Sequence, residues 1–207
     1  MDTNTTTTHA THHRDDFGSK MGMWLFLFTE LILFGGMFIV YMVYRIQYSE
    51  AFHFAAKELS VGLGTLNTMV LLTSSLTCVL AIVAMQKGNR RLSIVYLIVT
   101  KLLAVGFLIV KAIEWGGKIS HGIYPGSEVL ANKENGEIIF FGLYYSMTGL
   151  HALHIIIGLV ILSFSLVFIL KGKITPDNYV KLETGGLYWH LVDIIWIFLF
   201  PLFYLLH

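Results

Sequence analysis

Residues 138–170 read "IIFFGLYYSMTGLHALHIIIGLVILSFSLVFIL", a run of 33 residues without Asp, Glu, Lys, Arg or Pro. A helix needs about 20 apolar residues to cross the hydrocarbon core of a bilayer, which is about 30 Å thick. As one helix this run would be about 50 Å long, so it is long enough to cross the bilayer and to project beyond it. We expect the projection at the N-terminal end, because the basic residues Lys171 and Lys173 follow the other end and favour the interface.

The rest of the chain repeats this pattern. Further apolar runs cover residues 21–44, 63–85, 92–115 and 187–206. Hydrophobic residues make up 56% of the 207 positions and charged residues 13%, whereas a soluble domain is about 25% charged. Alternation typical of strands is absent. The sequence therefore predicts an all-α integral membrane bundle of five transmembrane helices, forming one domain over residues 20–207.

The first nineteen residues, "MDTNTTTTHATHHRDDFGS", form a polar tail over residues 1–19. They contain no apolar segment of the kind found in a cleavable signal peptide, and their composition is typical of disorder. His9, His12 and His13 could collect a stray metal ion, but a solvated tail is the simpler interpretation.

Basic residues predict how the bundle is oriented. The loops assigned to one side hold Arg14, Lys20, Lys87, Arg90, Arg91, Lys171, Lys173 and Lys181, and those on the other side hold Arg45, Lys57, Lys118 and Lys133. Positive residues favour the cytoplasmic side, so we expect a cytoplasmic N-terminus and an external C-terminus. Aromatic residues near the ends of the runs, Trp24 and Trp189 inside and Tyr41, Tyr44, Trp115, Tyr144 and Tyr204 outside, are expected to mark the interfaces. The net charge of +1 argues against a nucleic-acid partner.

Several ionisable residues lie within the apolar runs, where each charge costs about 2.5 to 3.5 kcal/mol at the bilayer centre. Lys111 and Glu114 are neighbours on one helix face and are expected to form a structural ion pair near the outer end, within reach of water. Lys101 lies deeper, and its role is left open. The single cysteine, Cys78, lies in the second run and cannot form an intrachain disulfide.

Histidines in the last two runs raise the question of metal or heme binding. Counted from Lys171, His154 lies about 25 Å from the inner interface, whereas His190 lies only about 5 Å from it, so the two could not share an ion. We therefore expect no metal site, and expect His151 and His154 to be neutral imidazoles that hydrogen-bond between helices. His190 and Asp193 share a face, and they are expected to pair with each other or with Ser or Thr on a neighbouring helix.

Glu30 is the most isolated of these groups, about 14 Å deep when counted from Met21. Its side chain is too short to reach water from that depth, so the apolar core favours the neutral, protonated carboxyl. Two interpretations stand equally: a hydrogen bond to a neighbouring helix, or a buried functional carboxyl that supports proton uptake.

The sequence resembles subunit III of the heme-copper terminal oxidases. The matching blocks are "FLFTELILFGGMF" (26–38), "LNTMVLLTSSLT" (66–77), "FLIVKAIEW" (107–115), "HGIYPGS" (121–127), "TGLHALHIIIG" (148–158) and "LETGGLYWHLVDIIWIFLF" (182–200). The resemblance implies a subunit without a catalytic site, redox cofactor or metal, which binds subunit I of a proton-pumping oxidase, with subunit II in the same complex and heme and copper in the partners.

The resemblance also implies roles for single residues. Glu30 matches the carboxyl of the family that reacts with carbodiimides, and the polar motif positions of the family, which would hold helices together and serve subunit contacts, match His151, His154, Glu183, His190 and Asp193. It further implies bound phospholipid, a bacterial cytoplasmic membrane and, as a possibility for the complex, a larger respiratory supercomplex.

The chain departs from the longer form of the family, which has seven spans and a lipid-filled cleft after the second. Its five spans are typical of a short bacterial form. Cytochrome c oxidase is the favoured type because Glu30 stands where the quinol-oxidase branch tends to have Asp. A quinol oxidase and the accessory subunit of a nitric oxide reductase are the alternatives, followed by a stand-alone transporter and a heme-binding redox subunit.

Overall fold

The computed structural model describes residues 16–206 and is helical almost throughout this range. Its helices are α1 (Asp16–Gln47), α2 (Ser49–Lys57), α3 (Val61–Gln86), α4 (Arg90–Ser120), α5 (Glu128–Ala131), α6 (Asn135–Leu170) and α7 (Val180–Tyr204). In the described residues, five of these are long and apolar enough to cross a membrane, namely α1, α3, α4, α6 and α7. This confirms the predicted all-α bundle of five membrane helices.

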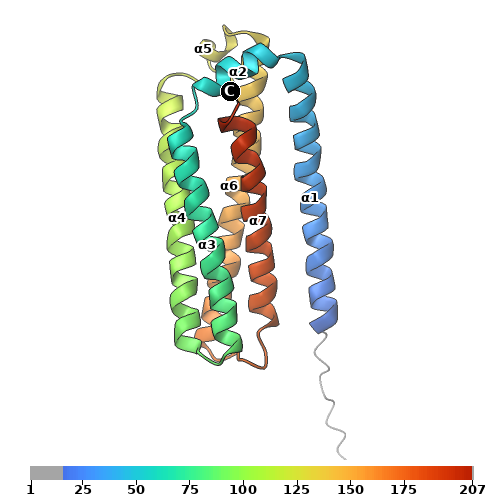
Figure 1. Ribbon diagram of the computed structural model, residues 1–207, viewed down its shortest axis with the longest axis vertical. Coiled ribbons are helices and arrows are strands. Elements are labelled where there is room, and N and C mark those ends of the chain that lie inside the picture. The colour runs from blue at the N-terminus through green and yellow to red at the C-terminus, as the bar shows by residue number, and fades with distance from the viewer. Residues whose placement is uncertain (1–15, 207) are drawn as a thin grey trace, which may run out of the picture.

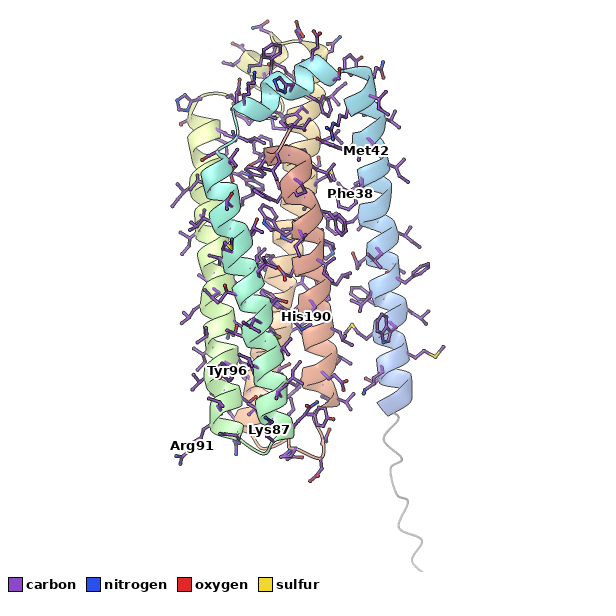
Figure 2. All side chains as sticks on the ribbon, viewed as in Figure 1. Phe38, Met42, Lys87, Arg91, Tyr96 and His190 are labelled. Atoms are coloured by element: carbon purple, nitrogen blue, oxygen red, sulfur yellow. The ribbon has the colours of Figure 1, made fainter. Side chains whose placement is uncertain are left out.

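The long helices run roughly parallel to one axis (Figure 1). Helices α3, α4, α6 and α7 form a bundle, and α1 stands at its side next to α7. The short helices α2 and α5 lie together at one end, which we call the α2/α5 end, and Lys87 and Arg91 mark the opposite end (Figure 2). The chain reaches the α2/α5 end again at the close of α7 (Figure 1).

Local sequence signals begin and end the helices. Ser60, Asn89 and Ser127 cap α3, α4 and α5, each accepting a hydrogen bond from the amide three residues ahead. Gly88 has a φ of +77°, a left-handed conformation that glycine adopts without strain, and it closes the short turn between α3 and α4.

The helices extend beyond the predicted apolar runs. Helix α1 begins at Asp16 rather than near residue 21, and α7 begins at Val180 rather than near residue 187. The apolar runs leave out the polar first turns of α1 and α7, because hydropathy alone defines a run. A helix can nevertheless continue past the hydrocarbon core of the membrane. Helices α2 and α5 lie in segments expected to be loops; α2 forms because Ala51, Phe52, Ala55 and Ala56 give it one buried face. The polar tail, with His9, His12 and His13, lies outside the described residues.

Helix α7 is the centre of the structure and α1 its periphery. In the most apolar window of each helix, 56% of the residues of α7 are buried inside the protein, against 11% for α1. The buried apolar residues of α1 are Leu27, Phe34 and Tyr41, spaced by seven, so α1 presents one narrow seam to the bundle. Its other faces expose large apolar side chains, as a lipid-facing helix does.

Several aromatic residues expected at the interfaces are instead in the core. Trp189, Tyr41, Tyr144 and Tyr204 are almost completely buried. Trp189 Nε1 donates to Ser74 Oγ at 3.2 Å, and the Tyr41 hydroxyl donates to the carbonyl of Leu202. Of the predicted belt, Trp24 is 62% exposed and stays a predicted interface residue. Trp189, Tyr41, Tyr144 and Tyr204 join helices because a buried N–H or O–H finds a partner on a neighbouring helix.

Gly158 sets how closely α6 approaches α7. A Cβ atom at this position would lie 2.8 Å from Cε3 of Trp189 and 3.3 Å from Cε1 of Tyr188, closer than such atoms normally approach. Small residues at helix contacts are a general means of packing in membranes, where burial of apolar surface does not drive helices together.

We expect Gly158→Ala to lower the unfolding free energy by about 1 to 3 kcal/mol, because it forces Trp189 and Tyr188 to shift. Thermal unfolding of the purified chain in detergent would measure this effect. Gly142→Ala is the matched control on the same helix, where an added Cβ has no neighbour within 4 Å. Equal stability of the two variants would show that α6 and α7 do not pack through Gly158.

Candidate functional site

The candidate site is the contact of Glu30 on α1 with His154 on α6. Glu30 Oε2 lies 2.8 Å from His154 Nε2, and their side chains are 13% and 8% exposed. The Phe34 ring packs on the edge of the imidazole, with ring centroids 5.3 Å apart. Glu30 has no polar neighbour in sequence other than Thr29. Its carboxyl therefore finds a partner, His154, that is 124 positions away.

The contact corrects the predicted depths. From the observed helix ends and about 1.5 Å per residue, Glu30 lies about 21 Å from the start of α1 and His154 about 24 Å from the end of α6. The prediction placed them about 11 Å apart in depth because it started α1 at residue 21.

Hydrogen-bond counting fixes how many protons the pair holds. His154 Nδ1 lies 2.8 Å from the carbonyl oxygen of Leu150, which can only accept, so Nδ1 carries a proton. In the neutral imidazole Nε2 is then an acceptor, and the contact with Glu30 needs one more proton. Either a neutral carboxylic acid donates to Nε2, or a charged imidazole donates to a carboxylate. The apolar surroundings favour the neutral arrangement.

His151, one turn earlier on α6, differs from the prediction. It is fully buried, stacks on Trp196 with centroids 5.2 Å apart, and has Phe107 at its edge at 5.7 Å. Neither ring nitrogen has a hydrogen-bond partner among the described residues. The interhelical hydrogen bond expected of His151 is therefore wrong, and the ring packs as an aromatic residue.

A second polar cluster lies nearer the α2/α5 end. Lys111 Nζ is 3.0 Å from Glu114 Oε2, and it donates to the hydroxyls of Tyr144 at 3.2 Å and Tyr204 at 2.5 Å. The Tyr204 hydroxyl donates to Glu114 Oε1 at 2.6 Å. The expected ion pair of Lys111 and Glu114 is present. The expectation that it reaches water is wrong, because both side chains are only 3% exposed.

The cluster continues toward the end of the bundle. Lys133, between α5 and α6, lies 2.5 Å from Glu58 Oε1 and 3.0 Å from Glu137 Oε2. Burial lowers the pKa of Lys133, but its hydrogen bonds to Glu58 and Glu137 outweigh burial, so the pKa is raised overall. Lys118 on α4 donates to the backbone carbonyl of Glu58 at 3.0 Å.

The other predicted polar residues join α7 to its neighbours. His190 Nδ1 lies 2.6 Å from Ser75 Oγ on α3, so the alternative of a Ser or Thr partner is confirmed. Asp193 lies one turn further along and is 4% exposed; its Oδ1 has no partner among the described residues, while Ser75 interacts with its carboxyl. Near the start of α7, Glu183 forms an ion pair with Lys20 of α1 at 2.9 Å.

The depths of His154 and His190 are closer than predicted, about 24 Å and about 15 Å from the same end of the bundle. From the start of α7 at Val180, His190 lies about 15 Å along the helix, not about 5 Å, and Tyr188 donates to the carbonyl of His154 at 3.2 Å. The described residues nevertheless contain no group of three His, Cys, Asp or Glu side chains that could hold a metal. Lys101 is half-buried on α4, and Cys78 is buried as a free thiol.

Sequence reasoning missed the tyrosines of the second cluster. Tyr144 and Tyr204 looked like interface residues because each lies near the end of an apolar run. A usable signal was spacing: Tyr144 precedes His151 by seven residues and so shares its buried face. Nothing in the sequence indicated that Tyr204 would reach Lys111 from another helix.

These polar groups connect α1, α3, α4, α6 and α7 to one another inside a bundle of membrane-length helices, which defines a multi-pass membrane subunit stabilised by interhelical polar contacts. The chain belongs to the cytochrome c oxidase subunit III family, because the model of that family, described as "Cytochrome c oxidase subunit III", matches residues 1–207. It is thus subunit III of a heme-copper oxidase, which is an oxidoreductase complex.

Individual relatives agree with this family. The chain is 32% identical to "Cytochrome c oxidase subunit 3" of Alkalihalophilus pseudofirmus, over 90% of this chain and 85% of the relative. It is 30% identical to "Quinol oxidase subunit 3" of Bacillus spizizenii, over 90% and 86%. It is also 28% identical to "Heme-copper oxidase subunit I+III" of Aeropyrum pernix, over 90% of this chain and 22% of that longer protein.

The proton count at Glu30 gives a first prediction. Glu30→Gln keeps a donor for His154 Nε2, so its stability should stay close to that of the parent, whereas Glu30→Leu leaves Nε2 buried without a partner and should cost about 1 to 3 kcal/mol. Thermal unfolding would compare the two. The neighbouring Thr29→Val is the control, since the Thr29 hydroxyl bonds within its own helix. If Glu30→Gln destabilises as much as Glu30→Leu, the pair is ionic.

The buried ion pair gives a second prediction. Glu114→Leu should destabilise the bundle by about 3 to 5 kcal/mol, because it leaves the Lys111 ammonium buried without a counter-charge. The double variant Lys111→Met, Glu114→Leu should recover most of this loss in the same unfolding measurement. Glu128→Leu, at an exposed position of α5, should change the unfolding free energy by less than about 0.5 kcal/mol. A double variant no more stable than Glu114→Leu would contradict this account.

Proposed function

We propose that this chain is the non-catalytic subunit III of a proton-pumping aerobic cytochrome c oxidase, that it packs against subunit I, and that it supports proton uptake and the lifetime of the enzyme during turnover. Contact with subunit I is supported by the Aeropyrum pernix relative, whose name describes subunits I and III together. Subunit II belongs to the same proposed complex.

The observation that carries the functional part of this proposal is the pairing of Glu30 with His154. The contact holds a shared proton between α1 and α6, about 21 Å from the start of α1. A group that holds a proton there and exchanges it slowly would support proton uptake by a neighbouring subunit. This role needs no redox cofactor in this chain.

A quinol oxidase is the second candidate, and the Bacillus spizizenii relative favours it, because that protein is called a quinol oxidase subunit. The resemblance of the Glu30 position to the cytochrome c branch favours the first candidate. Activity of the purified complex with reduced cytochrome c, compared with a quinol, would distinguish the two.

Heme and copper are proposed in the partner subunits. The described part of this chain does not offer a ligand set for either: His154 is engaged by Glu30 and Leu150, His190 by Ser75, and the buried His151 is enclosed by Trp196 and Phe107. Bound phospholipid is proposed around the exposed apolar faces of the helices.

The proposed setting is the cytoplasmic membrane of a bacterium, with the α2/α5 end outside. Lys20, Lys87, Arg90, Arg91, Lys171, Lys173 and Lys181 lie toward the other end, and Arg45, Lys57, Lys118 and Lys133 toward the α2/α5 end. The excess of positive charge supports a cytoplasmic location for the end where α1 begins.

Purification through a tag on this chain tests the complex itself. We expect a heme-bearing subunit I to copurify in equal amount, and its optical spectrum to show the heme. A preparation without heme, from membranes that retain oxidase activity, would contradict the assignment of this chain to that complex.

Carbodiimide treatment tests the role of Glu30. A hydrophobic carbodiimide needs a protonated carboxyl in a setting poor in water, so mass spectrometry should find Glu30 modified and Glu183, paired with Lys20 near the helix ends, unmodified. In the assembled oxidase, Glu30→Ala should shorten the period over which proton pumping is sustained. If Glu30 is modified and the variant pumps and lasts like the parent, the pair only joins helices.

A further inference from the structure

Lys101 lies within α4 and has no partner in this chain. Its side chain is half-buried, and among residues 16–206 its ammonium forms no hydrogen bond and no salt bridge. Lys111, almost three turns further along the same helix, is bonded to Glu114 and to two tyrosine hydroxyls. The two lysines of this helix thus differ: one is satisfied inside the bundle, and the other needs a partner from outside the chain.

The depth of Lys101 excludes the membrane surface as the source of that partner. Helix α4 begins at Arg90, so Lys101 lies about 17 Å along it, and about 14 Å beyond Leu92, where the apolar run begins. The four-carbon stem of a lysine does not cover that distance, so the ammonium reaches neither water nor a lipid headgroup. An ammonium held within the hydrocarbon is costly, and it indicates a counter-charge at the same depth.

No described carboxyl group within the membrane helices of this chain supplies the counter-charge. Glu30, Glu114 and Glu183 form the pairs described above with residues other than Lys101. Asp193 interacts with a serine of α3. The missing anion must therefore come from another protein chain in the membrane.

The side of α4 that carries Lys101 turns toward α6. Lys101 and Trp115 are 14 residues apart, close to four helical turns, so they lie on nearly the same face. Trp115 packs on Tyr145 of α6 with ring centroids 5.5 Å apart. Lys101 therefore lies beside the contact of α4 with α6, which we call the α4/α6 seam, and α4 stands on the side of the bundle away from α1 (Figure 1).

Helix α6 contributes Leu159 to the same seam at the same depth. Leu159 follows Tyr145 by 14 residues and so shares its face. The start of α4 and the end of α6 are level, because Arg90 donates to the carbonyl of Leu170 at 2.7 Å. Leu159 lies about 17 Å from that end, as Lys101 does.

The surface around Lys101 is otherwise apolar and is hollowed beside it. On α4, Ile98 and Val105 flank the lysine and are 44% and 43% exposed. On α6, Leu159 borders a hollow of about 330 Å³, in which the Ser163 hydroxyl is engaged by the Leu159 carbonyl at 2.6 Å. A single charge among apolar side chains, beside a hollow that can accept a side chain, matches a packed helix better than it matches lipid tails.

We propose that the α4/α6 seam at Lys101 receives a membrane helix of subunit I, and that an Asp or Glu of that helix forms an ion pair with Lys101. The inference rests on the proposed contact with subunit I and names the surface and the chemistry of that contact. It is independent of the electron donor and of the role of Glu30.

Retention of subunit I in detergent tests the proposal. The complex is purified through a tag on this chain and diluted, and the heme retained per chain gives an apparent dissociation constant. Lys101→Met keeps the apolar length of the side chain and removes its charge; it should raise this constant about tenfold or more, because it leaves a buried carboxylate unpaired. Lys101→Arg should retain subunit I. Lys87→Met, an exposed lysine after α3, is the control and should behave as the parent does.

Unfolding of the chain separates docking from folding. Because Lys101 has no partner within the described chain, Lys101→Met should unfold at the same temperature as the parent or higher. A variant that retains subunit I as the parent does, or one whose weaker retention is matched by a lower unfolding temperature of the chain alone, would overturn the proposal.

Crosslinking identifies the partner with Lys101 left in place. A photoreactive amino acid that replaces Ile98, one turn away, should crosslink in the assembled complex to a peptide of subunit I that carries Asp or Glu within an apolar segment. Exchange of that acid for Lys, combined with Lys101→Glu, should then restore heme retention. Crosslinks to lipid alone would overturn the proposal. A parent complex without heme would instead contradict the proposed function, so the two failures are distinct.

Discussion

Hydrocarbon offers no hydrogen-bond partner, so a polar group inside this bundle is costly unless the protein itself supplies one. Lys111 shows the consequence most directly. Its ammonium lies on α4, its counter-charge Glu114 one turn away, and the hydroxyls that complete the set come from Tyr144 of α6 and Tyr204 of α7. Three helices are thus fixed relative to one another by one buried charge. The geometry must be good, because desolvation of an ion pair costs as much as its attraction returns unless further hydrogen bonds are made.

The same constraint explains how a peripheral helix is held. Helix α1 buries little of its surface, so apolar packing alone cannot define its position. Polar contacts do so instead: Lys20 meets Glu183, Glu30 meets His154, and the Tyr41 hydroxyl meets a carbonyl near the end of α7. The role in proton uptake proposed for Glu30 and its contact with α6 therefore involve the same atoms, and a test of one must measure the other.

The sequence predicted the number and order of the membrane helices because hydropathy over about 20 residues is a strong signal. The sequence also indicated which ionisable groups would lie within the membrane helices. It could not place them relative to one another: depth counted from the first apolar residue put His190 far from His154, because α7 begins with a polar turn that hydropathy excludes. Partners such as Ser75 were beyond prediction, since they depend on how helices rotate against one another, and uniformly apolar helices carry no periodic signal for that rotation.

The attachments of α1 have a consequence for biogenesis. They come at intervals of ten and eleven residues, close to three helical turns each, and each has a different chemistry: an ion pair, an acid with an imidazole, and a hydroxyl with a carbonyl. A copy of α1 that slid by one turn would lose all of them together, and a copy inserted upside down would place Tyr41 near Glu183, which would then lose its counter-charge. Helix α1 can therefore make all three contacts in only one register and one orientation. Only a correctly inserted chain completes the bundle.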